Sequence, residues 1–115
     1  MYRQVRNKYH NQRACVDGRW FDSKREARRF RELQLLERGG EISDLRTQVS
    51  YELIPTQPRR HGKAERSVHY IADFVYHDNR SGNTVVEDAK GARTSEYIIK
   101  RKLMLQKYGI EIKEV

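Results

Sequence analysis

The chain has 115 residues, which suits one compact domain and leaves no room for a second. Its net charge of +8 favours a polyanionic partner such as nucleic acid, although a merely soluble basic surface would carry the same charge. A single cysteine excludes an internal disulfide and a cysteine-based zinc site, and the lack of a signal peptide or membrane-spanning run predicts a cytoplasmic protein without a membrane partner.

The chain begins with a segment that we predict to be a flexible basic arm, residues 1–13. It holds several basic residues, no acidic residue and little apolar content. A short hairpin is predicted next, over residues 14–21, because Asp17-Gly18 is a pair that favours tight hairpin turns. The folded domain is therefore expected to cover residues 14–115.

The first helix is predicted from Ser23 to Arg38, since apolar residues recur there at spacings of three and four. Ser23 and Glu26 have the spacing of a capping box, and Gly39-Gly40 supplies the exit. The opposite face either contacts phosphates or is simply solvated, and it carries Arg25, Arg28, Arg29 and Arg31.

Three strands are predicted in the middle of the chain, over residues 49–54, 70–76 and 84–90. A turn over residues 77–83 joins the second and third strands into a hairpin. Residues 56–66 are predicted to be a mobile basic loop, whose candidate phosphate contacts are Arg59, Arg60 and Lys63.

A second helix is predicted after Gly91, with Thr94 or Ser95 as its N-cap and Gly109 at its end. Residues 110–115 alternate between apolar and charged side chains and should form a last strand. The order helix, three strands, helix, strand indicates an α/β fold. Further candidate phosphate contacts near this helix are Arg93 and Lys100.

Acidic residues enter the apolar strands of the predicted hairpin, where a carboxylate is costly unless a cation or a donor meets it. By strand alternation Asp73 shares a face with Ile71 and Val75, and Asp88 shares a face with Lys90. The hairpin should bring the two carboxylates and the ammonium together. Such a set suits magnesium-assisted hydrolysis of a phosphodiester, whereas the competing interpretation is two ordinary strand acids with a salt bridge to Lys90.

Two further acidic residues need interpretation. Glu26 either completes the capping box with Ser23 or reaches the metal site from the first helix. Glu87 should point away from Asp88 and Lys90, because neighbouring strand residues face opposite sides.

Several short segments between residues 14 and 115 carry the motifs of the chain: Val16-Asp17-Gly18, Phe21 to Ala27, Gly40 to Leu45 with Gln48, Tyr70 to Phe74, Val86 to Gly91, and Lys107 to Ile110. Together they resemble the PD-(D/E)XK nuclease superfamily. Within it they are similar to a family of short phage and prophage proteins that are likened to Holliday-junction resolvases.

The resemblance implies a restriction-endonuclease-like core, in which a central mixed sheet is flanked by helices. It also implies that Asp73 and Asp88 bind the metal, that Lys90 is the catalytic lysine and that Glu26 supports them as a further ligand. The metal would be magnesium, for which manganese would substitute, and no organic cofactor is expected.

Three positions leave details open. Ala72 stands where the name pattern of the superfamily has proline. Glu87 beside Asp88 leaves the identity of the ligand open, although strand alternation favours Asp88. Gln48 is either an accessory residue of the site or the donor of a structural hydrogen bond.

The resemblance and the charge together predict an endonuclease that selects branched DNA in phage replication or recombination. We expect a homodimer, because resolving a four-way junction needs two paired cuts. The alternative is a non-catalytic DNA-binding module on the same fold. An RNA-binding accessory protein is disfavoured, because the tyrosines fall mainly at core-like spacing.

Overall fold

The computed structural model describes residues 12–115, so the basic arm predicted over residues 1–13 lies almost entirely outside the described residues. Within them, the chain forms a two-stranded hairpin, a four-stranded mixed sheet and two helices, which confirms an α/β fold. The elements in chain order are β1 (Ala14–Val16), β2 (Arg19–Phe21), α1 (Lys24–Arg38), β3 (Ile42–Ile54), β4 (Val68–Asp78), β5 (Thr84–Asp88), α2 (Ser95–Tyr108) and β6 (Lys113–Glu114).

The predicted Asp-Gly hairpin and both helices are confirmed. β1 and β2 pair antiparallel around Asp17 and Gly18, whose φ angles of 51° and 79° are the positive values that a tight two-residue turn requires. Ser23 caps α1 by accepting a hydrogen bond from the amide of Glu26 at 3.1 Å. Thr94, one of the two predicted caps, begins α2 in the same way.

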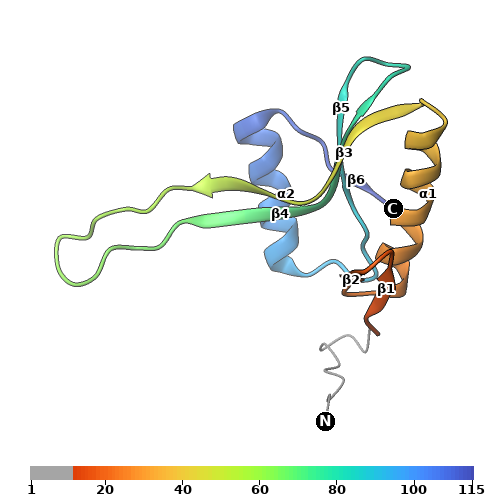
Figure 1. Ribbon diagram of the computed structural model, residues 1–115. Coiled ribbons are helices and arrows are strands. Elements are labelled where there is room, and N and C mark those ends of the chain that lie inside the picture. Colours follow the sequence, from red (N-terminus) through yellow and green to blue (C-terminus); the bar gives the residue numbers. More distant parts are fainter. Residues whose placement is uncertain (1–11) are drawn as a thin grey trace, which may run out of the picture.

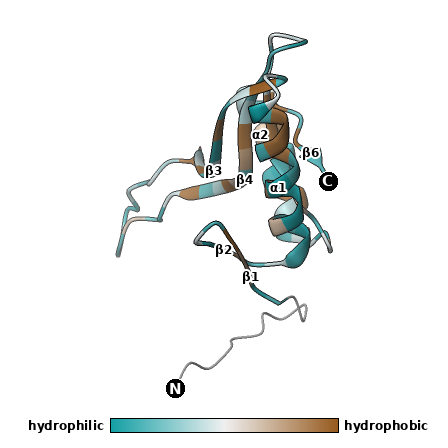
Figure 2. Cartoon of the chain, turned by 45° about the vertical axis from the view of Figure 1, so that its right-hand side comes forward, coloured by the Kyte–Doolittle hydropathy of each residue, from teal (hydrophilic) through white to brown (hydrophobic). Residues whose placement is uncertain are grey.

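The sheet has the order β3-β4-β5-β6, in which the first three strands are antiparallel and β6 runs parallel to β5. α1 covers one face and α2 covers the other, so the domain has three layers (Figure 1). The apolar cluster under α1 includes Phe30, Leu33 and Phe74, whereas the cluster under α2 includes Val86 and Met104. Figure 2 shows apolar residues gathered where the helices meet the strands.

Strand lengths differ from the sequence prediction. The strand expected over residues 49–54 begins at Ile42, and the one expected over 70–76 extends over Val68–Asp78. β5 ends at Asp88, so Lys90 lies beyond the strand, and β6 has two residues in place of the expected six. The start of β3 was missed because it is polar, and because its register shifts where the chain passes through a left-handed residue, Asp44 (φ 55°).

The expected alternation along β4 does not hold across Asp73. Tyr70, Ala72 and Val75 all belong to the cluster under α2, and a spacing of three between the last two breaks the two-residue period. Ile71, predicted to share the face of Asp73, is 54% exposed. Opposite this interruption, on β3, lies Gln48, which has a positive φ of 54°.

β3 and β4 continue beyond the body of the domain as a long hairpin (Figure 1). We call its end, residues 55–67, the arm tip. Gln57 and Glu65 bridge the arm tip through two backbone hydrogen bonds of 3.0 and 2.8 Å. The segment expected to be a loop lies outside the strands and keeps this one isolated bridge, and its mobility stays a prediction. Neither helix in residues 12–115 has the length and apolar character needed to cross a bilayer.

Candidate active site

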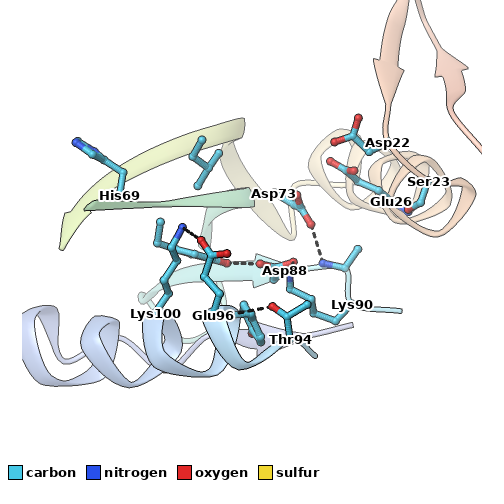
Figure 3. Close-up of a pocket in the computed structure, with 14 residues that line it drawn as sticks. Asp22, Ser23, Glu26, His69, Asp73, Asp88, Lys90, Thr94, Glu96 and Lys100 are labelled. Carbon is cyan, nitrogen blue, oxygen red and sulfur yellow. Dashed lines mark hydrogen bonds and ion pairs between the residues drawn. The ribbon is translucent and has the colours of Figure 1, made fainter. Parts of the chain in front are cut away.

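Asp73 and Asp88 face each other across the β4–β5 hairpin. The register ends with the pair Phe74 and Glu87, and Asp73 and Asp88 are the next residues beyond this pair on the two strands. Figure 3 shows Asp73 between Asp88 and the start of α1, where Glu26 lies. The β4–β5 hairpin therefore brings together the acidic pair expected from the sequence.

Two donors hold the Asp73 carboxylate. Its Oδ2 accepts a hydrogen bond from the amide of Ala89 at 2.9 Å, and its Oδ1 accepts one from Gln48 Nε2 at 3.4 Å. Burial raises the pKa of Asp73 to about 8, and the negative charges of Asp88 and Glu26 add to this rise. At neutral pH this position therefore favours a bound proton or a bound cation.

The Asp88 side chain is buried and lies between a tyrosine and a lysine. Tyr70 donates its hydroxyl to Oδ2 at 2.6 Å, and Lys90 Nζ lies 3.2 Å from Oδ1. Burial and the neighbouring Asp88 raise the pKa of Tyr70, so the tyrosine remains a proton donor. The Lys90 ammonium also lies 4.2 Å from the centre of the Tyr97 ring, which holds it beside the carboxylate through a cation–π contact.

Glu26 joins the acidic pair through a single side-chain amide. Gln48 Nε2 donates to Glu26 Oε1 at 2.9 Å as well as to Asp73. The Glu26 side chain is buried, and this burial raises its pKa. Ser23 supplies its half of the capping box, while the Glu26 carboxylate is turned to Gln48. The left-handed backbone of Gln48 is uncommon outside glycine, and such strain is often found at functional sites.

Glu87 lies on the other face of β5, as the alternation predicts. Arg29 on α1 donates Nε to Oε1 and Nη2 to Oε2 of this fully buried carboxylate, both at 2.8 Å. The Tyr76 hydroxyl donates to it as well. Arg29, a candidate phosphate contact from the sequence, thus has its guanidinium engaged inside the fold, and a further bond joins it to Glu32.

A cleft of about 380 Å³ opens over the acidic pair (Figure 3). All four residues expected to be catalytic line it, together with the first turn of α2 and one candidate phosphate contact, Lys100, whose ammonium lies 3.2 Å from Glu96. Among the cleft residues that sequence reasoning did not assign to the site are two tyrosines, Tyr70 and Tyr97. Both were assigned to the core, and nothing in their local sequence distinguishes a core tyrosine from one whose hydroxyl or ring contacts a site residue.

The other candidate phosphate contacts are spread over the surface. Arg25 and Arg28 are exposed on α1. The arm tip presents Arg59, which lies 3.6 Å from Glu65, together with exposed Arg60 and Lys63. Arg93 is exposed but bonds Glu114 on β6 at 2.9 Å.

The chain matches the model of one protein family over residues 6–114, and that family is described as a protein of unknown function, DUF1064. The chain belongs to the DUF1064 family. No curated protein and no solved structure matches it.

In residues 12–115 of this DUF1064 protein, no three His, Cys, Asp or Glu side chains are arranged as a ready-made metal site. Magnesium does not require one, because it keeps several waters and binds through one or two carboxylates together with substrate phosphates. Asp73 and Asp88 are hard oxygen donors, and only one ammonium, that of Lys90, lies within 4 Å of either carboxylate in the described residues. The donor set therefore fits a magnesium ion.

Proposed function

We propose that this DUF1064 protein is a metal-dependent DNA endonuclease with a restriction-endonuclease-like core of the PD-(D/E)XK type. The observation that carries the proposal is the convergence of Asp73, Asp88, Lys90 and Glu26 on one cleft. The order of helices and strands and the mixed sheet between two helices are compatible with such a core. The net charge of +8 supports a polyanionic substrate.

Each carboxylate has one oxygen held by a short hydrogen bond and one in a longer contact, with Gln48 at 3.4 Å for Asp73 and with Lys90 at 3.2 Å for Asp88. Tyr70 holds Asp88 Oδ2 and the Ala89 amide holds Asp73 Oδ2. Asp73 and Asp88 would hold magnesium, with Glu26, which shares the Gln48 amide with Asp73, as a further ligand. A bound magnesium ion would acidify the attacking water and offset the charge that builds on the phosphate.

Lys90 supplies the positive charge of the site from the chain itself. Its ammonium lies 3.2 Å from Asp88 and 4.2 Å from the centre of the Tyr97 ring, and Lys90 lines the cleft where the scissile phosphate would bind. There it would stabilise the additional negative charge of the transition state. Tyr70 orients Asp88 for this arrangement without titrating.

The substrate we propose is branched DNA, cut in the cytoplasm during phage replication or recombination by a homodimer that uses magnesium or manganese. The exposed basic residues of α1 and the arm tip suit contacts to the phosphate backbone, which orient DNA without reading its sequence. Selectivity for a branched structure fits a surface of this kind better than selectivity for a sequence.

Cleavage of labelled DNA tests the proposal. Four-way junction, flap, single-stranded and linear duplex DNA would be incubated with magnesium, manganese or EDTA. Wild type would be compared with Asp88→Asn and with Asp44→Asn, a matched control at an exposed acid of the same sheet. We expect metal-dependent cutting by wild type and the control, and a loss of at least about 100-fold in Asp88→Asn. If the protein binds DNA but does not cut it with either metal, the endonuclease proposal is wrong and a DNA-binding module is supported.

A further inference from the structure

The outer face of the β1–β2 hairpin presents a large aromatic side chain that the core does not use. Phe21 on β2 points inward and is 4% exposed, whereas its neighbour Trp20 is 62% exposed. The partner of Trp20 across the hairpin is Cys15, which is also exposed. An indole that faces solvent in this way contributes little to folding and is available to a ligand.

One basic side chain lies against this indole. The guanidinium of Arg13 lies 5.2 Å from the centre of the Trp20 ring. Arg19, which precedes Trp20 on β2, faces the side of Phe21, where it donates a hydrogen bond of 3.1 Å to Thr47 and contacts the Phe30 ring. Arg19 and Trp20 both line one hollow of the surface. An exposed aromatic ring with a guanidinium group beside it is a combination by which proteins hold the bases and phosphates of an unpaired strand.

Trp20 lies on a hollow that adjoins the acidic cleft. This hollow of about 610 Å³ is lined by the β1–β2 hairpin, the start of α1 and the middle of β3, including Gln48. Asp22 and Glu26 line both the hollow and the cleft. A strand whose phosphate lies at Asp73 and Asp88 could therefore continue past Glu26 to the indole.

We propose that Trp20 stacks on an unpaired nucleobase of the DNA strand next to the phosphate that is cut. A base inside a duplex has both faces covered by its neighbours, so the contact requires a base that is already unstacked, as at a branch point or a flap. Trp20 would thus select distorted or single-stranded DNA over continuous duplex. This inference rests on the proposed function for the identity of its ligand.

The indole also provides the probe, because Trp20 is the one tryptophan of the chain. Its fluorescence would be followed in EDTA while a single-stranded oligodeoxynucleotide, or a blunt duplex of the same sequence, is added. We expect saturable quenching by the single strand and little by the duplex. Equal quenching by both, or none, would overturn the proposal. Emission that changes with protein concentration alone would overturn it in favour of a contact between two copies of the chain.

Substitutions separate stacking from a general loss of binding. Trp20→Ala should weaken single-strand binding, measured by anisotropy of a dye-labelled oligonucleotide, by about 5- to 150-fold, the range for stacking one base on an aromatic ring. Trp20→Phe should retain most of the affinity. Leu35→Ala removes a similarly exposed apolar side chain from α1 and should change nothing. Equal affinity in Trp20→Ala and wild type would overturn the inference, and a matching melting temperature would show that the variant is folded.

The binding assays need neither metal nor cleavage, so they separate this inference from the proposed function. If single-stranded DNA quenches the Trp20 fluorescence but the protein cuts no DNA, the proposed endonuclease activity is wrong and the Trp20 contact is supported. Normal metal-dependent cutting with unquenched Trp20 fluorescence would support the endonuclease and overturn the Trp20 contact.

Discussion

The surroundings of Asp73 disfavour the negatively charged form of its carboxyl group. One backbone amide and the Gln48 side chain donate to it, but Asp88 and Glu26 face it with negative charge and the fold shields it from water. Its pKa therefore rises to about 8 from the ordinary value of 3.8. Between these two values the folded protein holds a proton that the unfolded chain has released.

This difference in proton binding predicts how the stability of the metal-free protein depends on pH. A raised pKa contributes stability that is complete below the pKa of the unfolded chain and is lost as the pH rises through the pKa of the folded state. In EDTA we expect a melting temperature several degrees lower at about pH 8.5 than at about pH 5.5. Magnesium at the higher pH should restore part of the loss, since a cation can replace the proton.

Asp73→Asn should flatten this dependence, because the amide does not titrate. Asp44→Asn, on the same sheet but 71% exposed at its side chain, should keep the slope of the wild type. A wild-type melting temperature that stays constant or rises between the two pH values would contradict the prediction. Thermal unfolding followed by circular dichroism measures all three proteins.

At the scale of elements, the buried ion pair between Arg29 and Glu87 ties α1 to β5. Glu26 lies one turn before Arg29 on the helix, and Asp88 follows Glu87 on the strand. The ion pair therefore helps to set the spacing between two acids of the site, although neither of its members enters the cleft.

Replacing only one member of this ion pair should lower the free energy of unfolding strongly. Replacing both members should lower it less. Arg29→Met leaves Glu87 charged and buried, which should lower the free energy of unfolding by about 3–5 kcal/mol. In the double variant Arg29→Met with Glu87→Gln, no unpaired buried charge remains, so most of that loss should return. Urea denaturation of wild type, both single variants and the double variant measures the coupling. Losses that simply add in the double variant would contradict it.

The elements were predictable where local sequence carries their cause. The spacing of apolar residues along α1 and the Asp-Gly turn between β1 and β2 are local signals, and both were confirmed. The register that brings Asp73 to Asp88 follows from the short turn between β4 and β5. These features account for the layered arrangement and for the centre of the site.

The remaining features depend on contacts between distant parts of the chain. The sequence gives no sign that Gln48 is left-handed or that its amide links two acids. Arg29 was grouped with the exposed arginines of its helix because its partner, Glu87, lies 58 residues away. Tyr70 resembled any core residue of an apolar strand, and only the packed structure shows its hydroxyl bonded to Asp88.

At the scale of the whole molecule, shape and charge act together. The domain measures 54 × 46 × 22 Å, and the arm tip projects away from the two helices (Figure 1). The arm tip carries exposed Arg59, Arg60 and Lys63, and the ion pair between Arg59 and Glu65 is too exposed to neutralise it. A DNA duplex with one strand in the cleft would therefore meet a second, separate group of positive charges.

The salt dependence of binding measures how many of these charges meet phosphates. Each phosphate contact lowers the slope of log K against log salt concentration by about 0.9 on duplex DNA. Replacing Arg59, Arg60 and Lys63, three of the four basic residues of the arm tip, by Gln should therefore make the slope shallower by about 2 to 3 on branched DNA with duplex arms. A control with the same change in net charge replaces the exposed Arg38, Arg80 and Lys102, and it should keep most of the slope. Equal slopes in the two triple variants would mean that net charge, and not the arm tip, governs binding.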